Sequence, residues 1–170
     1  CTVRNLKPHS AASATVNSSN LFQFSISRGG ADHGITVTGG HLEYGRTVSD
    51  NLQLDIKLSF VMQRGVSFQR NGLSDIFLSS TYTLQTYSNI TIGLKIPLGD
   101  GNTKINGLSL PMDFQSSLGT YDIIAGFGKR FEKLHFTAAV QLPLLQNNNQ
   151  FSAEAHSPDS EFKKFISTNA

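Results

Sequence analysis

Every second residue from residue 52 to residue 62 is apolar, and the residues between them are polar except for Val61. The apolar positions are Leu52, Leu54, Ile56, Leu58, Phe60 and Met62. Successive side chains of a strand point to opposite faces, so this segment has an apolar face and a polar face that carries Asp55 and Lys57. The same pattern recurs over residues 90–96 and 134–142, and it predicts an antiparallel sheet with two chemically distinct faces.

The alternation predicts seven strands over most of the chain. They lie at residues 21–28, 35–46, 51–64, 74–86, 89–97, 120–131 and 133–144, with a weaker eighth near 150–155. Residues 1–20 are small and polar and predict a flexible lead-in. Residues 157–170 form a tail, in which Ser157 to Ser160 either caps a short helix over residues 161–167 or belongs to a loop. The strand region is therefore residues 21–156.

The connections between these strands alternate in length. Tight turns are predicted at residues 48–51, 87–89 and 132–133, and longer connections at residues 65–73 and 99–118. Short turns at one end and longer loops at the other are typical of outer-membrane barrels. We expect residues 99–118 to form a mobile excursion at the extracellular rim, because their Gly, Asn and Pro content disfavours regular structure.

Composition narrows the possible classes of protein. Charged residues make up 15% of the 170 residues, against roughly 25% in soluble domains. Hydrophobic residues make up 38%, and the absence of a run of about 18 apolar residues excludes a helical membrane protein. The net charge of +2 comes without a basic cluster, so we expect no nucleic-acid partner.

The single cysteine, Cys1, cannot form an internal disulfide. The chain begins without Met, so we expect either a processed chain or a fragment, with Cys1 either lipidated or an accident of where the chain is cut. Trp is absent, and Tyr and Phe would have to form the aromatic girdles that membrane barrels usually carry.

Strands of about ten residues with one apolar and one polar face are the signature of a transmembrane β-barrel. The alternative is a soluble antiparallel sheet whose apolar face covers a core. We favour an all-β, antiparallel, up-and-down transmembrane β-barrel, incomplete at one or both ends.

A charge on the lipid face would cost roughly 2–4 kcal/mol at the bilayer midplane, so the polar faces of such a barrel must point inward. The residues predicted to line the lumen are Asp55, Lys57, Asp75, Lys95 and Asp122. The residues predicted to face outward are Leu54, Ile56, Leu58 and Phe60. In the soluble alternative, the charged residues would instead lie on a solvated outer face.

No catalytic or metal-binding motif is evident. The five histidines lack metal-ligand spacing, and the glycine-rich residues 29–34 lack the Lys-Ser/Thr ending of a phosphate loop. A Gly-x-Ser-x-Gly elbow is also absent. We therefore expect neither an enzyme nor a bound metal or cofactor.

Four segments resemble elements of the outer-membrane transporter family named for the meta-pathway of phenol degradation. Residues 44–52 are similar to its Tyr-Gly turn before an alternating strand, and residues 72–76 to its Gly-Leu-Gly/Ser-Asp strand opening. Residues 93–100 resemble its Gly-x-Lys-x-Pro-Thr-Gly element, with Leu98 in place of Thr. Residues 119–123 resemble its Gly-Ser-x-Asp strand opening, so the resemblance covers roughly residues 44–144.

This resemblance implies a bacterial outer-membrane barrel that passes small, hydrophobic molecules, with the lipid bilayer and a small solute as partners. The chain departs from the pattern because it ends at residues 167–170 without a terminal aromatic residue, and seven or eight strands are few for the family. We expect either missing C-terminal strands or a small barrel of eight. Two other functions stay open: a soluble β-barrel or sandwich that binds a ligand, and an outer-membrane anchor that transports nothing. The pattern does not determine the oligomeric state.

Overall fold

The fold is known from a computed structural model, which describes residues 20–30, 35–65, 69–85 and 87–156. The predicted lead-in, apart from Asn20, and the predicted tail lie outside the described residues. Within the described part, no helix has the length and apolar character of a membrane span.

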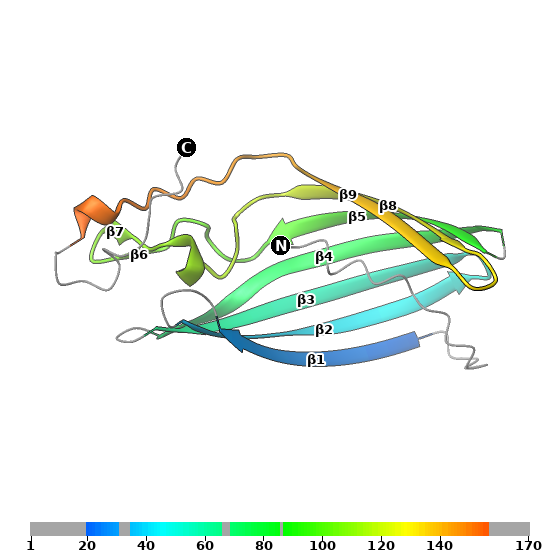
Figure 1. Cartoon of the computed structure of the whole chain (residues 1–170), viewed down its shortest axis with the longest axis horizontal. Helices are drawn as coiled ribbons and strands as arrows, with labels where there is room; N and C mark the ends of the chain where they lie inside the picture. Colours follow the sequence, from blue (N-terminus) through cyan, green and yellow to red (C-terminus); the bar gives the residue numbers. More distant parts are fainter. Residues whose placement is uncertain (1–19, 31–34, 66–68, 86, 157–170) are drawn as a thin grey trace.

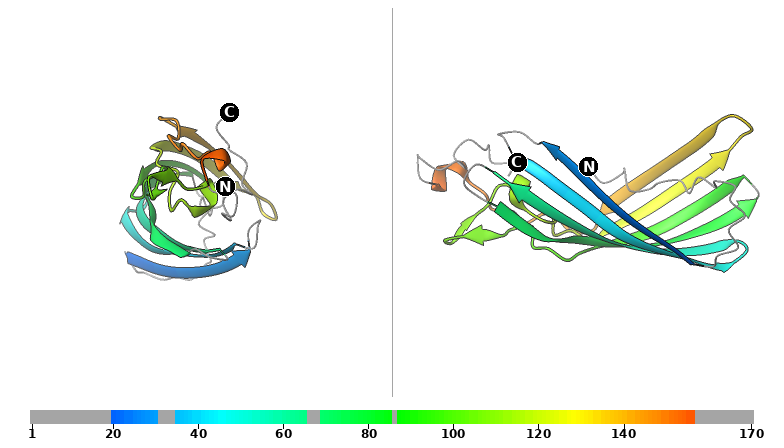
Figure 2. Two further views of the ribbon diagram at one scale, coloured as in Figure 1. Left: turned by 90° about the vertical axis from the view of Figure 1, so that its left-hand side faces the viewer. Right: turned by 90° about the horizontal axis from the view of Figure 1, so that it is seen from below.

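Seven antiparallel strands form one curved sheet in the order β1-β2-β3-β4-β5-β8-β9 (Figure 1). The strands are β1 (Asn20–Gly30), β2 (Thr36–Ser49), β3 (Leu52–Arg64), β4 (Gln69–Gln85), β5 (Ser88–Pro97), β8 (Asp122–Arg130) and β9 (His135–Pro143). Apart from the short strands β6 (Lys104–Ile105) and β7 (Leu108–Ser109), each strand pairs with the strands that come before and after it along the chain. This pairing gives the sheet an up-and-down topology. The sheet curls into an open trough when seen end-on, and β1 and β9 form its two edges (Figure 2).

The predicted all-β class and antiparallel up-and-down arrangement are confirmed, and the seven main strands lie within a few residues of their predicted positions. The predicted strand near residues 150–155 is wrong, because this segment contains a 3₁₀ turn, η4 (Ala153–Ala155). The predicted connection at residues 65–73 is too long, because β4 already begins at Gln69 and pairs with β3 from its first residue.

A β-bulge in β4 explains this second error. Leu58 pairs with Ile76, whereas Phe60 pairs with Leu73, so β4 has one extra residue at Ser74–Asp75. The extra residue changes the phase of the alternation, because Leu73 and Ile76 are three residues apart. From the sequence, this phase change is indistinguishable from the start of a new strand.

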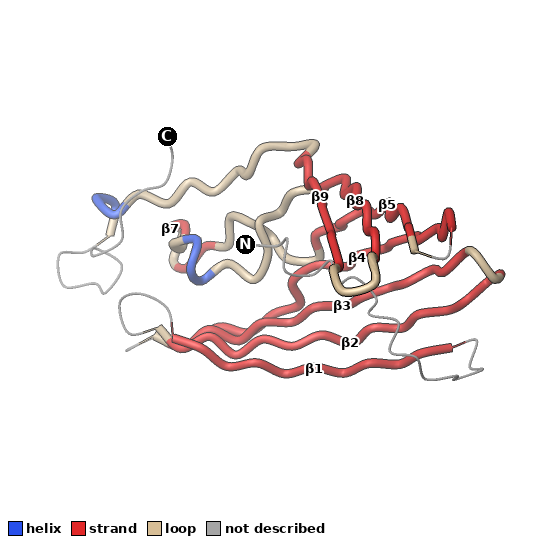
Figure 3. The backbone as a smooth tube through the Cα atoms, turned by 45° about the vertical axis from the view of Figure 1, so that its right-hand side comes forward, coloured by secondary structure: helices blue, strands red, loops and turns tan. Residues whose placement is uncertain are grey.

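Residues 99–118 are more ordered than the loop predicted there. They contain a small hairpin, β6 (Lys104–Ile105) and β7 (Leu108–Ser109), followed by the 3₁₀ turn η3 (Met112–Phe114). Together with the segment after β9, they form what we call the cap, residues 98–121 and 144–156, at one end of the trough (Figure 3). In the end-on view the cap lies within the curve of the sheet (Figure 2).

The cap carries the main apolar core of the described residues. Leu110 and Phe114 pack with Ile35 and Phe151, and all four side chains are at most 2% exposed. Hydrogen bonds join the two cap segments: Asn149 Nδ2 donates to the carbonyl oxygens of Gly101, at 3.0 Å, and Leu110, at 3.1 Å. The core therefore stabilises the cap and lies at one end of the trough.

The register places apolar side chains side by side on the outer face of the sheet. One row crosses all seven strands, through Phe22, Tyr44, Ile56, Leu78, Leu94, Ile123 and Leu142. Six of these side chains are exposed and Tyr44 is half-buried. Leu54 and Ile56 are exposed, as predicted for the outward face, whereas Lys57 on the opposite face is buried.

Gly40 gives a test of packing on the outer face. A Cβ atom at Gly40 would collide with the ring of Phe60, its partner on β3, and would lie 2.6 Å from the carbonyl oxygen of Ser25. We therefore expect Gly40→Ala to lower the free energy of unfolding by about 1–3 kcal/mol, the usual range for overpacking. Urea titration of the folded protein measures the change.

Gly29→Ala is the matched control, because a Cβ at Gly29 has no atom within 4 Å. If both variants unfold at the same urea concentration as the wild type, the close contact between Gly40 and Phe60 is not a constraint on the fold.

Candidate functional site

The inner face of the trough carries polar and charged side chains in register. A second row consists of residues adjacent in sequence to those of the apolar row, so their side chains point to the opposite face. This row runs through Gln23, Glu43, Lys57, Phe77, Lys95, Asp122 and Pro143. Lys57, Lys95 and Asp122 are all less than 9% exposed. A sheet with buried charges on one face and exposed apolar residues on the other reverses the usual arrangement of a soluble sheet.

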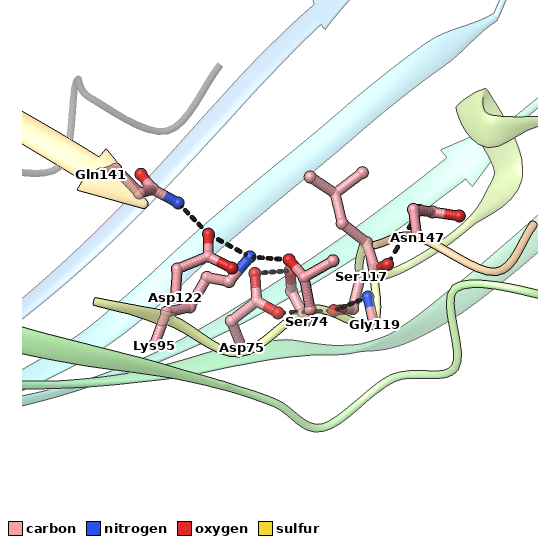
Figure 4. Close-up of polar contacts among 10 residues, drawn as sticks. Ser74, Asp75, Lys95, Ser117, Gly119, Asp122, Gln141 and Asn147 are labelled. Atoms are coloured by element: carbon pink, nitrogen blue, oxygen red, sulfur yellow. Dashed lines mark hydrogen bonds and ion pairs between the residues drawn. The ribbon is translucent and has the colours of Figure 1, made fainter. Parts of the chain in front are cut away.

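Lys95 and Asp122 form the centre of the site. They lie directly opposite each other on β5 and β8, and Lys95 Nζ is 2.9 Å from Asp122 Oδ2. Lys95 Nζ also donates to Thr120 Oγ1 at 2.9 Å, and Gln141 Nε2 on β9 donates to Asp122 Oδ2 (Figure 4). A buried ion pair is stable only when further hydrogen bonds satisfy its atoms. Thr120 and Gln141 contribute two such bonds here, whereas Asp122 Oδ1 has no hydrogen-bond partner among the described residues.

Asp75 lies beside this pair and holds the cap. The bulge in β4 directs Asp75 to the inner face, where it is 8% exposed and accepts a 2.5 Å hydrogen bond from Ser117 Oγ of the cap. Ser117 Oγ in turn accepts from the backbone N–H of Gly119 at 3.0 Å. Ser74 precedes Asp75 in β4. Its carbonyl oxygen accepts hydrogen bonds from the backbone N–H groups of Leu98 and Gly99, at 3.0 and 3.2 Å. The bulge therefore anchors both ends of the first cap segment.

Other polar contacts attach the cap to the wall of the trough. Gln63 Nε2 on β3 donates to the carbonyl oxygen of Gln115 at 2.9 Å, and Gln63 is 5% exposed. The Gln115 side chain folds back into the cap, where it bonds the N–H and C=O of Thr103. The cap thus contacts the inner face through buried hydrogen bonds from three strands: β3, β4 and β5.

The five residues predicted to line a lumen all lie on the inner face, but they do not form one cluster. Lys95 and Asp122 are bonded to each other, and Asp75 joins them through the cap. Near the start of β3, Asp55 accepts a 2.8 Å hydrogen bond from Gln53 Nε2. Lys57 lies between these regions, opposite Phe77 in the register. Their role in lining a lumen stays a prediction.

Sequence reasoning missed Ser117, Thr120 and Gln141 as parts of the site. Gln141 occupies a polar position in an alternating strand, so its face was predictable although its partner was not. Ser117 and Thr120 lie in a connection whose path no periodic pattern specifies. The described residues contain no group of three His, Cys, Asp or Glu side chains that could hold a metal ion.

Comparison with known proteins does not assign a family: no family model matches the chain, and no curated protein matches it. The function therefore has to be inferred from the arrangement of the residues.

The Lys95–Asp122 pair gives a test of the site's energetics. Lys95→Met leaves the carboxylate of Asp122 buried without its cation, and we expect the free energy of unfolding to fall by about 3–5 kcal/mol. The double variant Lys95→Met/Asp122→Leu removes both charges, so most of this loss should be recovered. Urea titrations of the three proteins measure the differences.

Lys129→Met is the control within β8, because Lys129 is exposed and lies over the ring of Phe131. Its effect should stay below about 1 kcal/mol. A double variant as unstable as Lys95→Met would show that the loss comes from packing and not from an unpaired charge.

Proposed function

We propose that this chain forms the wall of a β-barrel in a bacterial outer membrane and that small, largely apolar molecules pass through it. The observation that carries the proposal is the apolar outer face, which extends in register across all seven strands. Soluble monomers rarely expose so continuous an apolar surface, whereas a membrane protein places it against lipid. The partners in this proposal are the bilayer and an uncharged or weakly polar solute.

The distribution of buried residues supports the same proposal. The buried residues of the inner face include Lys57, Lys95 and Asp122 as well as Phe77 and Ile124, and the cluster of buried apolar residues lies at the cap instead of beneath the sheet. A soluble sheet of this size would instead bury its apolar face. The resemblance of residues 44–144 to the meta-pathway transporter family adds an independent argument from the sequence.

Aromatic residues on the outer face fit contact with lipid. Phe22 and Tyr44 pair across β1 and β2 with ring centroids 4.7 Å apart, and Phe24 stacks on Phe60 at 6.5 Å. Such cross-strand aromatic pairs stabilise the sheet without a second layer above it. The outer face can therefore be ordered while it stays free to meet acyl chains.

Insertion into a bilayer is tested by adding a charge to one face at a time. Leu78 and Ser79 are neighbours on β4, and only Leu78 belongs to the outer apolar row. We expect Leu78→Lys to weaken folding into phosphatidylcholine vesicles by about 2–4 kcal/mol if the site is near the midplane. Urea titration of the vesicle-bound protein measures the loss.

Ser79→Lys is the matched control, because Ser79 faces Asp55 in the register on the inner side. It should insert nearly as well as the wild type. If Leu78→Lys instead folds normally in water without detergent or lipid, the membrane proposal is wrong and the soluble ligand-binding alternative is favoured.

A second candidate function is an outer-membrane anchor that transports nothing. The observation that favours it is the cap, which lies within one end of the trough and is held by buried hydrogen bonds. Passage and anchoring differ in whether the cap leaves a path open or can be displaced.

Passage is measured as efflux of small uncharged solutes from vesicles that contain the full chain. Ser117→Ala removes the hydrogen bonds to Asp75 and from Gly119, so we expect a looser cap and efflux about twofold to tenfold faster than in the wild type. Ser27→Ala is the control: it removes only a 3.4 Å hydrogen bond to the carbonyl oxygen of Gly39 within the sheet, so it should leave efflux unchanged. If the Ser117→Ala and Ser27→Ala proteins both fold correctly and neither gives efflux, the anchor function is supported.

A further inference from the structure

A hollow of about 720 Å³ lies between the cap and the ends of β8 and β9. Its volume falls within the range of pockets that hold small-molecule ligands. Thr120, Asp122 and Gln141 form its polar part together with Gln146, Asn147 and Asn149, and Leu118, Leu144 and Leu145 contribute to its apolar part. The hollow therefore combines an apolar surface with a small group of polar side chains from three segments.

The charge of the hollow is balanced. Asp122 is the one charged side chain among the described residues that line it, and Lys95 neutralises Asp122 from behind at 2.9 Å. A cationic ligand would compete with Lys95 for a carboxylate that already has its cation. An anionic ligand would be placed beside Asp122, and no Lys or Arg is among the described residues that line the hollow. Balanced charge in a partly desolvated site thus favours an uncharged ligand.

Gln141 offers a hydrogen-bond acceptor to such a ligand. Its Nε2 donates to the carboxylate of Asp122, which fixes the orientation of the amide, because the opposite orientation would place two oxygens together (Figure 4). Its Oε1 then has no partner among the described residues. A hydroxyl group of a ligand can donate a hydrogen bond to this oxygen.

The leucines supply a surface that a ligand could cover. Leu144 is 56% exposed and Leu145 is 58% exposed, although both belong to the cap, which has a buried core of its own. Exposed apolar side chains that border a concave polar site are typical of ligand pockets. Covering them would remove apolar surface from water and stabilise the bound state.

We propose that this hollow binds an uncharged molecule that has an apolar body and a hydroxyl group. The hydroxyl donates to Gln141 Oε1, and the apolar body lies against Leu118, Leu144 and Leu145. This inference rests on the proposed function, because it assigns a chemical class to the solute and a place where the solute pauses.

The test compares three probes of one size: 1-hexanol, hexanoate and hexylammonium. Each is titrated into the full chain in phosphatidylcholine nanodiscs, and NMR follows the side-chain amide of Gln141 and the methyl groups of Leu144 and Leu145. We expect saturable shifts with 1-hexanol and affinities about tenfold lower or worse for both charged probes. Empty nanodiscs correct for partition of the probes into lipid.

Leu145→Ala and Leu142→Ala form a matched pair, because both leucines are 58% exposed but only Leu145 borders the hollow. Leu145→Ala should weaken 1-hexanol binding about threefold or more, whereas Leu142→Ala should leave it unchanged. Gln141→Leu should weaken it about threefold to tenfold through the lost acceptor.

Four results would each overturn the inference. Three are no saturable 1-hexanol binding, equal binding of the charged probes, and equal losses in Leu145→Ala and Leu142→Ala. A Gln141→Leu protein that binds 1-hexanol like the wild type overturns it as well. Efflux from vesicles is measured separately. Efflux without binding at the hollow leaves the proposed function standing, whereas binding without efflux supports the ligand site and contradicts passage.

Discussion

The register of six antiparallel ladders is the constraint on which the rest of this structure depends. Because side chains alternate along each strand, a shift of one residue in any ladder would mix the two faces. The ladders avoid this mixing, so Leu78 and Leu94 continue the apolar row of Ile56 while Lys95 meets Asp122 on the other side. Two chemically opposite surfaces therefore arise from one layer of strands, and no second layer is needed to separate them.

The one major change of phase in the sheet is also where the cap is attached. The bulge at Ser74–Asp75 turns a carboxylate toward the inner face and leaves the Ser74 carbonyl oxygen to receive the backbone of Leu98 and Gly99. Bulges commonly redirect side chains next to functional sites. Here the bulge links the wall and the cap, so the position of the hollow beside Asp122 depends on a local irregularity in β4. Substitutions that remove the bulge would disturb the cap and the outer apolar face together.

Much of the sheet could be predicted from the sequence, because period-two alternation depends only on residue type and position. The strands around Ile56, Ile92 and Phe136 follow from that pattern alone. The pairing of Lys95 with Asp122 does not, because it requires the register between β5 and β8, which are separated by the cap segment of residues 98–121. The cap itself was missed for a different reason: its order comes from a few buried residues such as Phe114 and from side-chain hydrogen bonds, which leave no periodic signal.

The topology also limits how the trough can close. Six antiparallel ladders separate β1 from β9, so these two edge strands run in the same direction. Direct closure would pair them in parallel, and a second copy with the same orientation in a membrane would place its β1 parallel to β9 in the same way. Closure by antiparallel pairing alone, as in the even-stranded barrels of bacterial outer membranes, requires an odd number of further strands between β1 and β9. In lipid an unpaired edge leaves backbone N–H and C=O groups without partners, so the membrane proposal requires this closure as well as an apolar outer face.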